Sequence, residues 1–160
     1  MPKAQDQNQQ SQYPFFIHDQ YIKDLSFENP NYVAKYDEKN KNKQPEVGVN
    51  VETHVSKFDD EHYEVAMNLT AKSELDGTSI FVLELTYAGL VAVAKDLKPD
   101  VLEPVLLVHC PFLMFPFARE IVASVTRAGG YPPLMLDPID FASLYLAKKK
   151  EVEENKGVAN

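Results

Sequence analysis

Three segments in the first half of the chain alternate apolar and polar residues, with the period of two that is typical of a strand with one buried face. Apolar side chains take the odd positions in each segment, within 47–55, 63–69 and 81–87. Asp76-Gly77, between the second and third segments, suits the positive φ angles of a tight hairpin. The pattern predicts an antiparallel meander whose odd positions face the core and whose even positions face solvent.

A fourth strand is predicted ahead of this meander, over residues 15–27, where aromatic and β-branched side chains are frequent. Its alternation is poorer because Asp19, Lys23 and Asp24 interrupt it. The residues that follow, 29–44, are polar and are bounded by prolines at 30 and 45. They are predicted to form a long connecting loop.

After Ala94 the apolar residues recur at helical spacing. The helix ends are marked by three kinds of signal: a capping box, prolines suited to a first turn, and a glycine pair that ends a helix. These signals predict helices over about 100–110, 116–128 and 138–150, the first of which ends at Pro111. Because the strands precede the helices and do not alternate with them, the fold class is α+β, with a four-stranded antiparallel sheet followed by two to three helices.

Length and composition indicate one domain, since 160 residues with 44% hydrophobic and 25% charged side chains are typical of a soluble globular unit. We expect this domain over 13–150, a disordered polar tail over 1–12 and a disordered acidic tail over 151–160. The first tail lacks the apolar region of a secretory signal. The longest uncharged run, 104–118, is shorter than a membrane span. A cytoplasmic protein that does not insert into membranes is expected.

The charge of the chain is −8, from 16 basic and 24 acidic residues, which is the wrong sign for binding a nucleic acid or an anionic membrane. Nine of the acids lie between 46 and 86, against only Lys57 and Lys72. Most of the negative charge therefore belongs to the predicted sheet. Two interpretations remain open for it: a solvated face, or a docking patch for a basic partner.

Catalytic and metal-binding chemistry finds little support in the sequence. The four histidines do not fall in ligand-spaced motifs, and Cys110 is the single cysteine. His109 and Cys110 are adjacent, so on a helix their side chains point about 100° apart, which disfavours a thiolate–imidazole pair. We expect no cofactor, no metal and no enzymatic activity, with a hydrolase as the least favoured alternative.

The region from Pro111 to Pro138 is unusually rich in large apolar side chains and contains five prolines. This is more apolar surface than the short helices predicted here can bury within one subunit. It is either core plus a subunit interface, or an exposed groove for apolar segments of another protein.

Four segments of the chain, in this order, resemble the bacterial SecB protein-export chaperones. The likeness covers residues 21–145 and its most specific part is Pro116-Phe117-Ala118-Arg119-Glu120. The segments are Tyr21-Ile22-Lys23-Asp24-Leu25-Ser26-Phe27-Glu28, Gln44-Pro45-Glu46-Val47, Phe115 to Glu120, and Pro133-Leu134 with Pro138-Ile139, Phe141 and Leu144-Tyr145.

This resemblance implies an ATP-independent holdase that keeps unfolded secretory precursor proteins competent for export and delivers them to the SecA motor. It implies a homotetramer built as a dimer of dimers, without cofactor or catalytic residues. The family's SecA-binding surface is an acidic patch on the outer sheet face. The matching positions are Asp24, Glu28, Val82 and Glu84.

The family also binds clients in an apolar groove edged by the loop between the first two strands. The chain departs from the family here, because Lys43 stands where an aromatic residue is expected. Tyr32 and Tyr36 are the candidates for the missing ring. The expected client-binding residues are Val49, Val51, Tyr32, Tyr36, Phe112 and Phe115. The alternative from another class is an acidic adaptor that binds one folded partner and uses its apolar region only to form an oligomer.

Overall fold

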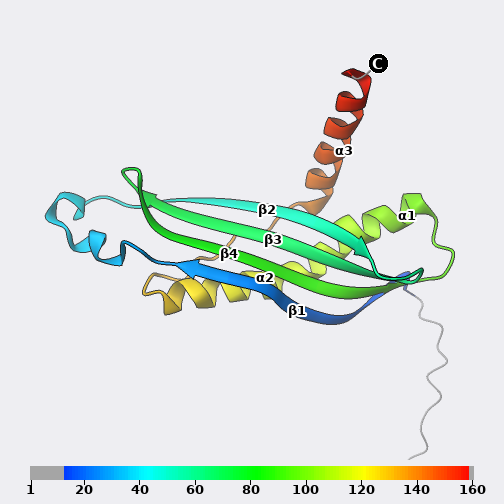
Figure 1. Ribbon diagram of the computed structural model, residues 1–160, viewed down its shortest axis with the longest axis horizontal. Coiled ribbons are helices and arrows are strands. Elements are labelled where there is room, and N and C mark those ends of the chain that lie inside the picture. The colour runs from blue at the N-terminus through cyan, green and yellow to red at the C-terminus, as the bar shows by residue number, and fades with distance from the viewer. Residues whose placement is uncertain (1–12, 159–160) are drawn as a thin grey trace, which may run out of the picture.

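The computed structural model describes residues 13–158, and its central element is a four-stranded antiparallel sheet (Figure 1). The predicted meander and the additional strand are both confirmed. In the sheet the strand order is β1-β4-β3-β2, so β1 and β2 form the two edges. The strands are β1 (Phe15–Glu28), β2 (Glu46–Lys57), β3 (His62–Leu75) and β4 (Thr78–Val93).

The parity predicted for β3 and β4 is also confirmed, because their odd positions form the core. The fully buried side chains there include Val65, Met67, Leu83 and Leu85. Asp76 and Gly77, which connect these strands, have φ angles of 48° and 75° and form the expected hairpin turn. In β1 the register shifts between Ile17 and Asp19 and between Ile22 and Asp24. These irregularities explain why its alternation is poor in the sequence.

The first two predicted helices are one continuous helix of 30 residues, and the expectation that Pro111 separates them is wrong. The helix consists of α1 (Pro99–Pro104), a π-helical turn (Val105–His109) and α2 (Cys110–Ala128). A proline ring clashes with the carbonyl group four residues earlier in an α-helix. The wider π turn directly before Pro111 relieves that clash, so the helix passes through the proline.

One stripe of α2 packs on the inner face of the sheet and closes the core. Gly89 of β4 allows close contact, since a Cβ atom there would lie 3.0 Å from Sδ of Met114. By length and composition alone the helix over 99–128 could cross a membrane, which the shorter uncharged run in the sequence did not suggest. Its buried stripe accounts for much of this apolar composition as the core helix of the fold. The stripe consists of Cys110, Pro111, Met114, Phe115, Ala118, Val122 and Thr126.

The last helix, α3 (Phe141–Val158), projects away from the sheet on the side of β2 (Figure 1). It was expected to end near Lys150, but residues 151–158, predicted as a disordered tail, continue it. Lysine and glutamate are good helix formers, which explains the extension. The predicted tail over 1–12 and the last two residues lie outside the described part of the chain. The expected long loop after β1 contains two 3₁₀ turns, Tyr32–Tyr36 and Glu38–Asn40.

Candidate functional site

The four residues that the sequence assigned to an acidic docking surface lie together on the outer face of the sheet. In the register of β1 and β4, Glu28 pairs with Val82, Ser26 pairs with Glu84 and Asp24 pairs with Thr86. Paired residues of antiparallel strands point to the same side. Residues more than 50 positions apart in the chain are thus brought into one surface. We call it the acidic row: Asp24, Glu28 and Glu84, with Val82 beside them.

The three carboxylates of the acidic row are exposed. Among the described residues, none of the three takes part in an ion pair or a side-chain hydrogen bond. Lys72 of β3 pairs in register with Val82 and is the nearest base on this face across β4, but within residues 13–158 it too forms no ion pair. The negative charge of the row is therefore available to a partner.

Next to the acidic row, a polar cluster crosses the outer face from β1 to β3. The Lys23 ammonium lies 2.5 Å from Oε1 of Glu64, and the Tyr21 hydroxyl donates a hydrogen bond to Oε2 of the same carboxylate. Sequence reasoning missed this cluster, because only the register shift at Lys23 places Tyr21 on the outer face. The hydrogen bonds from Lys23 and Tyr21 lower the pKa of Glu64, and the bond to Glu64 raises the pKa of Tyr21 to about 12.

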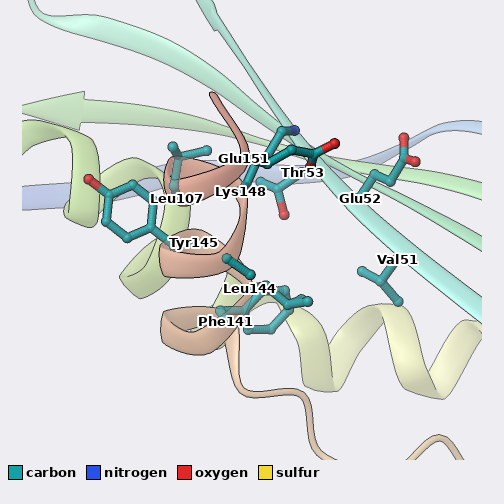
Figure 2. Close-up of a pocket in the computed structure, with 10 residues that line it drawn as sticks. Val51, Glu52, Thr53, Leu107, Phe141, Leu144, Tyr145, Lys148 and Glu151 are labelled. Carbon is teal, nitrogen blue, oxygen red and sulfur yellow. The ribbon is translucent and has the colours of Figure 1, made fainter. Parts of the chain in front are cut away.

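An apolar pocket of about 400 Å³ lies on the inner side, between β2 and α3 (Figure 2). Val51 contributes from the strand, and Phe141, Leu144 and Tyr145 contribute from the helix. This volume is typical of a small binding site and accommodates one or two large side chains. Val51, which the family resemblance assigned to the client groove, lines this pocket, and Val49 lies two residues away on the same face of β2 and is 46% exposed.

Tyr32 and Tyr36 belong to a row of aromatic rings that runs from the loop into the core. The ring centroids of Tyr36 and Tyr32 are 6.5 Å apart, and those of Tyr32 and Tyr131 are 5.4 Å apart. Tyr131 in turn packs on Phe81, at 5.0 Å. The ammonium of Lys35 lies 3.8 Å from the centre of the Tyr32 ring, a cation–π contact. Lys43, which replaces the expected aromatic residue, forms an ion pair with Asp76.

Comparison with known proteins identifies the family. A family model described as preprotein translocase subunit SecB matches residues 7–152. The chain belongs to the SecB family. It is 45% identical over 140 residues to the protein-export protein SecB of Paramagnetospirillum magneticum, covering 88% of each chain. It is 36% identical to the protein of the same name from Bartonella quintana, covering 98% of this chain and 96% of the relative.

A solved structure confirms the SecB-like fold. The Mycobacterium tuberculosis Rv1957 SecB-like chaperone, solved in complex with a ChAD peptide from the Rv1956 HigA1 antitoxin, matches with a TM-score of 0.62. The match covers 79% of this chain and 91% of that one, at 15% sequence identity. The expected α+β class, an antiparallel sheet followed by helices, is therefore confirmed by structure as well as by sequence.

The protein is a protein-export chaperone of the SecB family, which is cytoplasmic and has no enzymatic activity. The environment of Cys110 agrees with this. Its side chain is fully buried, and burial raises the pKa of the thiol to about 12, so no thiolate nucleophile forms near neutral pH. His109 lies beside Phe15, with the ring centroids 6.5 Å apart.

Two phenylalanines that the sequence assigned together to the SecB client groove have opposite surroundings on α2. Phe112 is 65% exposed, on the side of the helix turned away from the sheet. Phe115 is 6% exposed and packs against Phe141, with ring centroids 5.9 Å apart. The assignment of Phe115 to the client surface is therefore corrected. It is a core residue, because it lies on the stripe of α2 that covers the sheet.

Proposed function

We propose that four copies of this chain assemble as a dimer of dimers and act in the cytoplasm as an ATP-independent holdase. Unfolded secretory precursors bind the apolar surface beside β2, and the acidic row docks the SecA motor. The observation that carries the proposal is the division between the two faces of one sheet. The acidic row, whose carboxylates form no ion pair within residues 13–158, is outside, and the pocket lined by Val51 and α3 is inside.

Client binding at such a surface follows from the area that it can bury. One aromatic side chain of a client, burying about 200 Å², contributes about 5 kcal/mol at 25 cal/mol per Å². Association costs about 4 to 15 kcal/mol, so one filled pocket is not enough for stable binding. A client must fill several pockets at once, which only an extended chain can do. Hydrophobic burial is nondirectional, so this selects unfolded, apolar-rich polypeptides without a sequence code.

Docking of SecA at the acidic row depends on several charges acting together. An exposed ion pair contributes only about 0 to 1 kcal/mol, so no single carboxylate of the row dominates binding. Grouped like charges steer a basic partner to the surface, and salt screens this attraction. The proposal therefore includes a salt dependence: SecA affinity falls as the ionic strength rises, while client affinity does not.

Two sets of variants test the division of labour between the faces. Val51→Arg places a charge in the pocket, and Val47→Arg is its control, since Val47 is a valine on the same face of β2 that lies outside the pocket. Asp24→Lys and Glu84→Lys reverse the acidic row, and Glu46→Lys, elsewhere on the outer face, is their control.

We expect V51R to bind an unfolded precursor weakly and SecA normally, and D24K and E84K to show the reverse, measured by titration calorimetry at low salt. Each control should behave as the wild type. Wild-type client affinity in a folded V51R protein would remove the pocket from the client surface. Wild-type SecA affinity in D24K and E84K would remove the acidic row from the docking surface.

The alternative, an acidic adaptor for one folded partner, predicts a different result. A holdase delays the aggregation of several unrelated unfolded proteins, and an adaptor protects none of them. Light scattering during dilution of unfolded proteins from denaturant, with and without the chain, separates the two. The half-exposed apolar side chains around the pocket, including Leu144, favour the holdase.

A further inference from the structure

The cluster of Tyr21, Lys23 and Glu64 borders the acidic row. It contains the Lys23 ammonium, the positive charge that is adjacent to the row in the sequence. Lys23 directly precedes Asp24, the first carboxylate of the row. The register shift between Ile22 and Asp24 leaves Lys23 without a paired residue on β4. Pairing with β4 therefore does not set the direction of the Lys23 side chain. An ion pair with a nearby carboxylate sets it instead.

Glu64 is that carboxylate. Its Oε1 atom lies 2.5 Å from the Lys23 ammonium, across β4 on the third strand of the outer face. The side chain of Glu64 is only 23% exposed, against 53% for Lys23, so the pair forms at a partly shielded site. Its other oxygen accepts the Tyr21 hydroxyl, which fixes the carboxylate from a second direction.

Small side chains on β4 and β3 leave space for Lys23 to reach from β1 across β4 to Glu64. Ala88 of β4 pairs in register with both Tyr21 and Ala66, and it is fully buried although it belongs to the outer face. Two alanines in neighbouring strands leave room for the longer side chains of β1 to lie across the sheet. The small side chains between β1 and β3 therefore favour the contact of Lys23 and Tyr21 with Glu64.

We propose that Glu64 is a positioning residue of the docking surface: it holds the Lys23 ammonium toward β3 and so keeps the Asp24 carboxylate free for a basic partner. Without Glu64, the carboxylates nearest to Lys23 along β1 are Asp19 and Asp24, both on the outer face. An ammonium that moves to Asp24 cancels a charge of the row. This inference rests on the proposed docking of SecA at the acidic row.

The test measures SecA affinity at low salt with the full chain. Glu64→Gln keeps the size of the side chain and removes its charge, and we expect it to weaken SecA binding about two- to fivefold, the range that exposed ion pairs span. The double variant E64Q/K23Q has the wild-type net charge and no ammonium to release, so it should recover the wild-type affinity. Glu74→Gln on the same strand is the control, because it removes the same charge without freeing a lysine.

Each outcome decides the inference. It is overturned if E64Q binds SecA no more weakly than E74Q, or if E64Q/K23Q remains as weak as E64Q. Client binding, measured on the same preparations, should equal that of the wild type and shows that the variants are folded. D24K in the same series separates the two proposals: if D24K is weak and E64Q is not, only the role of Glu64 fails, whereas a D24K protein of normal affinity removes both.

Discussion

The face of α2 that is turned away from the sheet predicts how the subunits associate. Phe112, Leu113 and Phe117 are 65%, 48% and 54% exposed there, on one side of a helix whose other side is in the core. An apolar stripe of this kind is covered in a stable soluble protein. If four copies associate through this face, replacing Phe112 with Ser should break the assembly into smaller units.

The magnitude follows from the exposed area. A phenylalanine has about 200 Å² of surface, of which Phe112 leaves roughly 130 Å² uncovered, and burying that area contributes about 3 kcal/mol at 25 cal/mol per Å². A twofold contact contains the residue twice, so the F112S change weakens one such contact by about 6 kcal/mol. Each 1.4 kcal/mol is a factor of ten, so the dissociation constant should rise about 10⁴-fold.

Sedimentation equilibrium over a range of protein concentrations measures this change directly. The wild type should remain associated at low micromolar concentration, and the F112S protein should dissociate while keeping the circular dichroism of a folded chain. Phe58→Ser is the control, since Phe58 is 77% exposed in the turn between β2 and β3, away from α2. If F112S stays fully assembled but loses affinity for an unfolded precursor, the reasoning is refuted and Phe112 belongs to the client surface instead.

Two further predictions concern single groups. Because the folded chain lowers the pKa of Glu64 below its ordinary 4.5, its contribution to stability is complete above that value and is lost as the pH falls through the lower folded pKa. Urea unfolding should therefore show E64Q less stable than the wild type at pH 7, with the difference disappearing in acid; a constant difference would contradict the ion pair. Cys110 should resist iodoacetamide at pH 8 in the folded protein and react once per chain in urea, with C110A as the blank. Rapid labelling of the folded chain would show that α2 separates from the sheet.

Much of the sheet could be predicted from the sequence, because a strand with one buried face has a period that is visible locally. The odd apolar positions of β3 and β4 and the Asp76-Gly77 turn depend only on neighbouring residues, and all of them are confirmed. The members of the acidic row were also accessible, although the pairing of β1 with β4 was not. Asp24 and Glu84 came from the family resemblance, and parity alone placed Val82 and Glu84 on the outer face.

The helices were harder to predict, because a proline ends a helix only where the preceding backbone cannot adjust to avoid its ring. The π turn at Val105–His109 lets the helix continue through Pro111 into α2. Phe112 and Phe115 look equivalent in the sequence. Only the direction of the helix on the sheet makes one of them surface and the other core.

The sequence by itself determined the fold class through its periodicity and the two chemical characters of the surface through its composition, and its motifs indicated the family by resemblance. Tertiary structure decided which side chains meet. The contact of Lys23 with Glu64 joins residues 41 positions apart and needs both a register shift and the strand order β1-β4-β3. Likewise, the pocket of Val51 exists only because the first part of α3 lies beside β2. Such long-range geometry is set by packing over the whole domain, which local patterns do not encode.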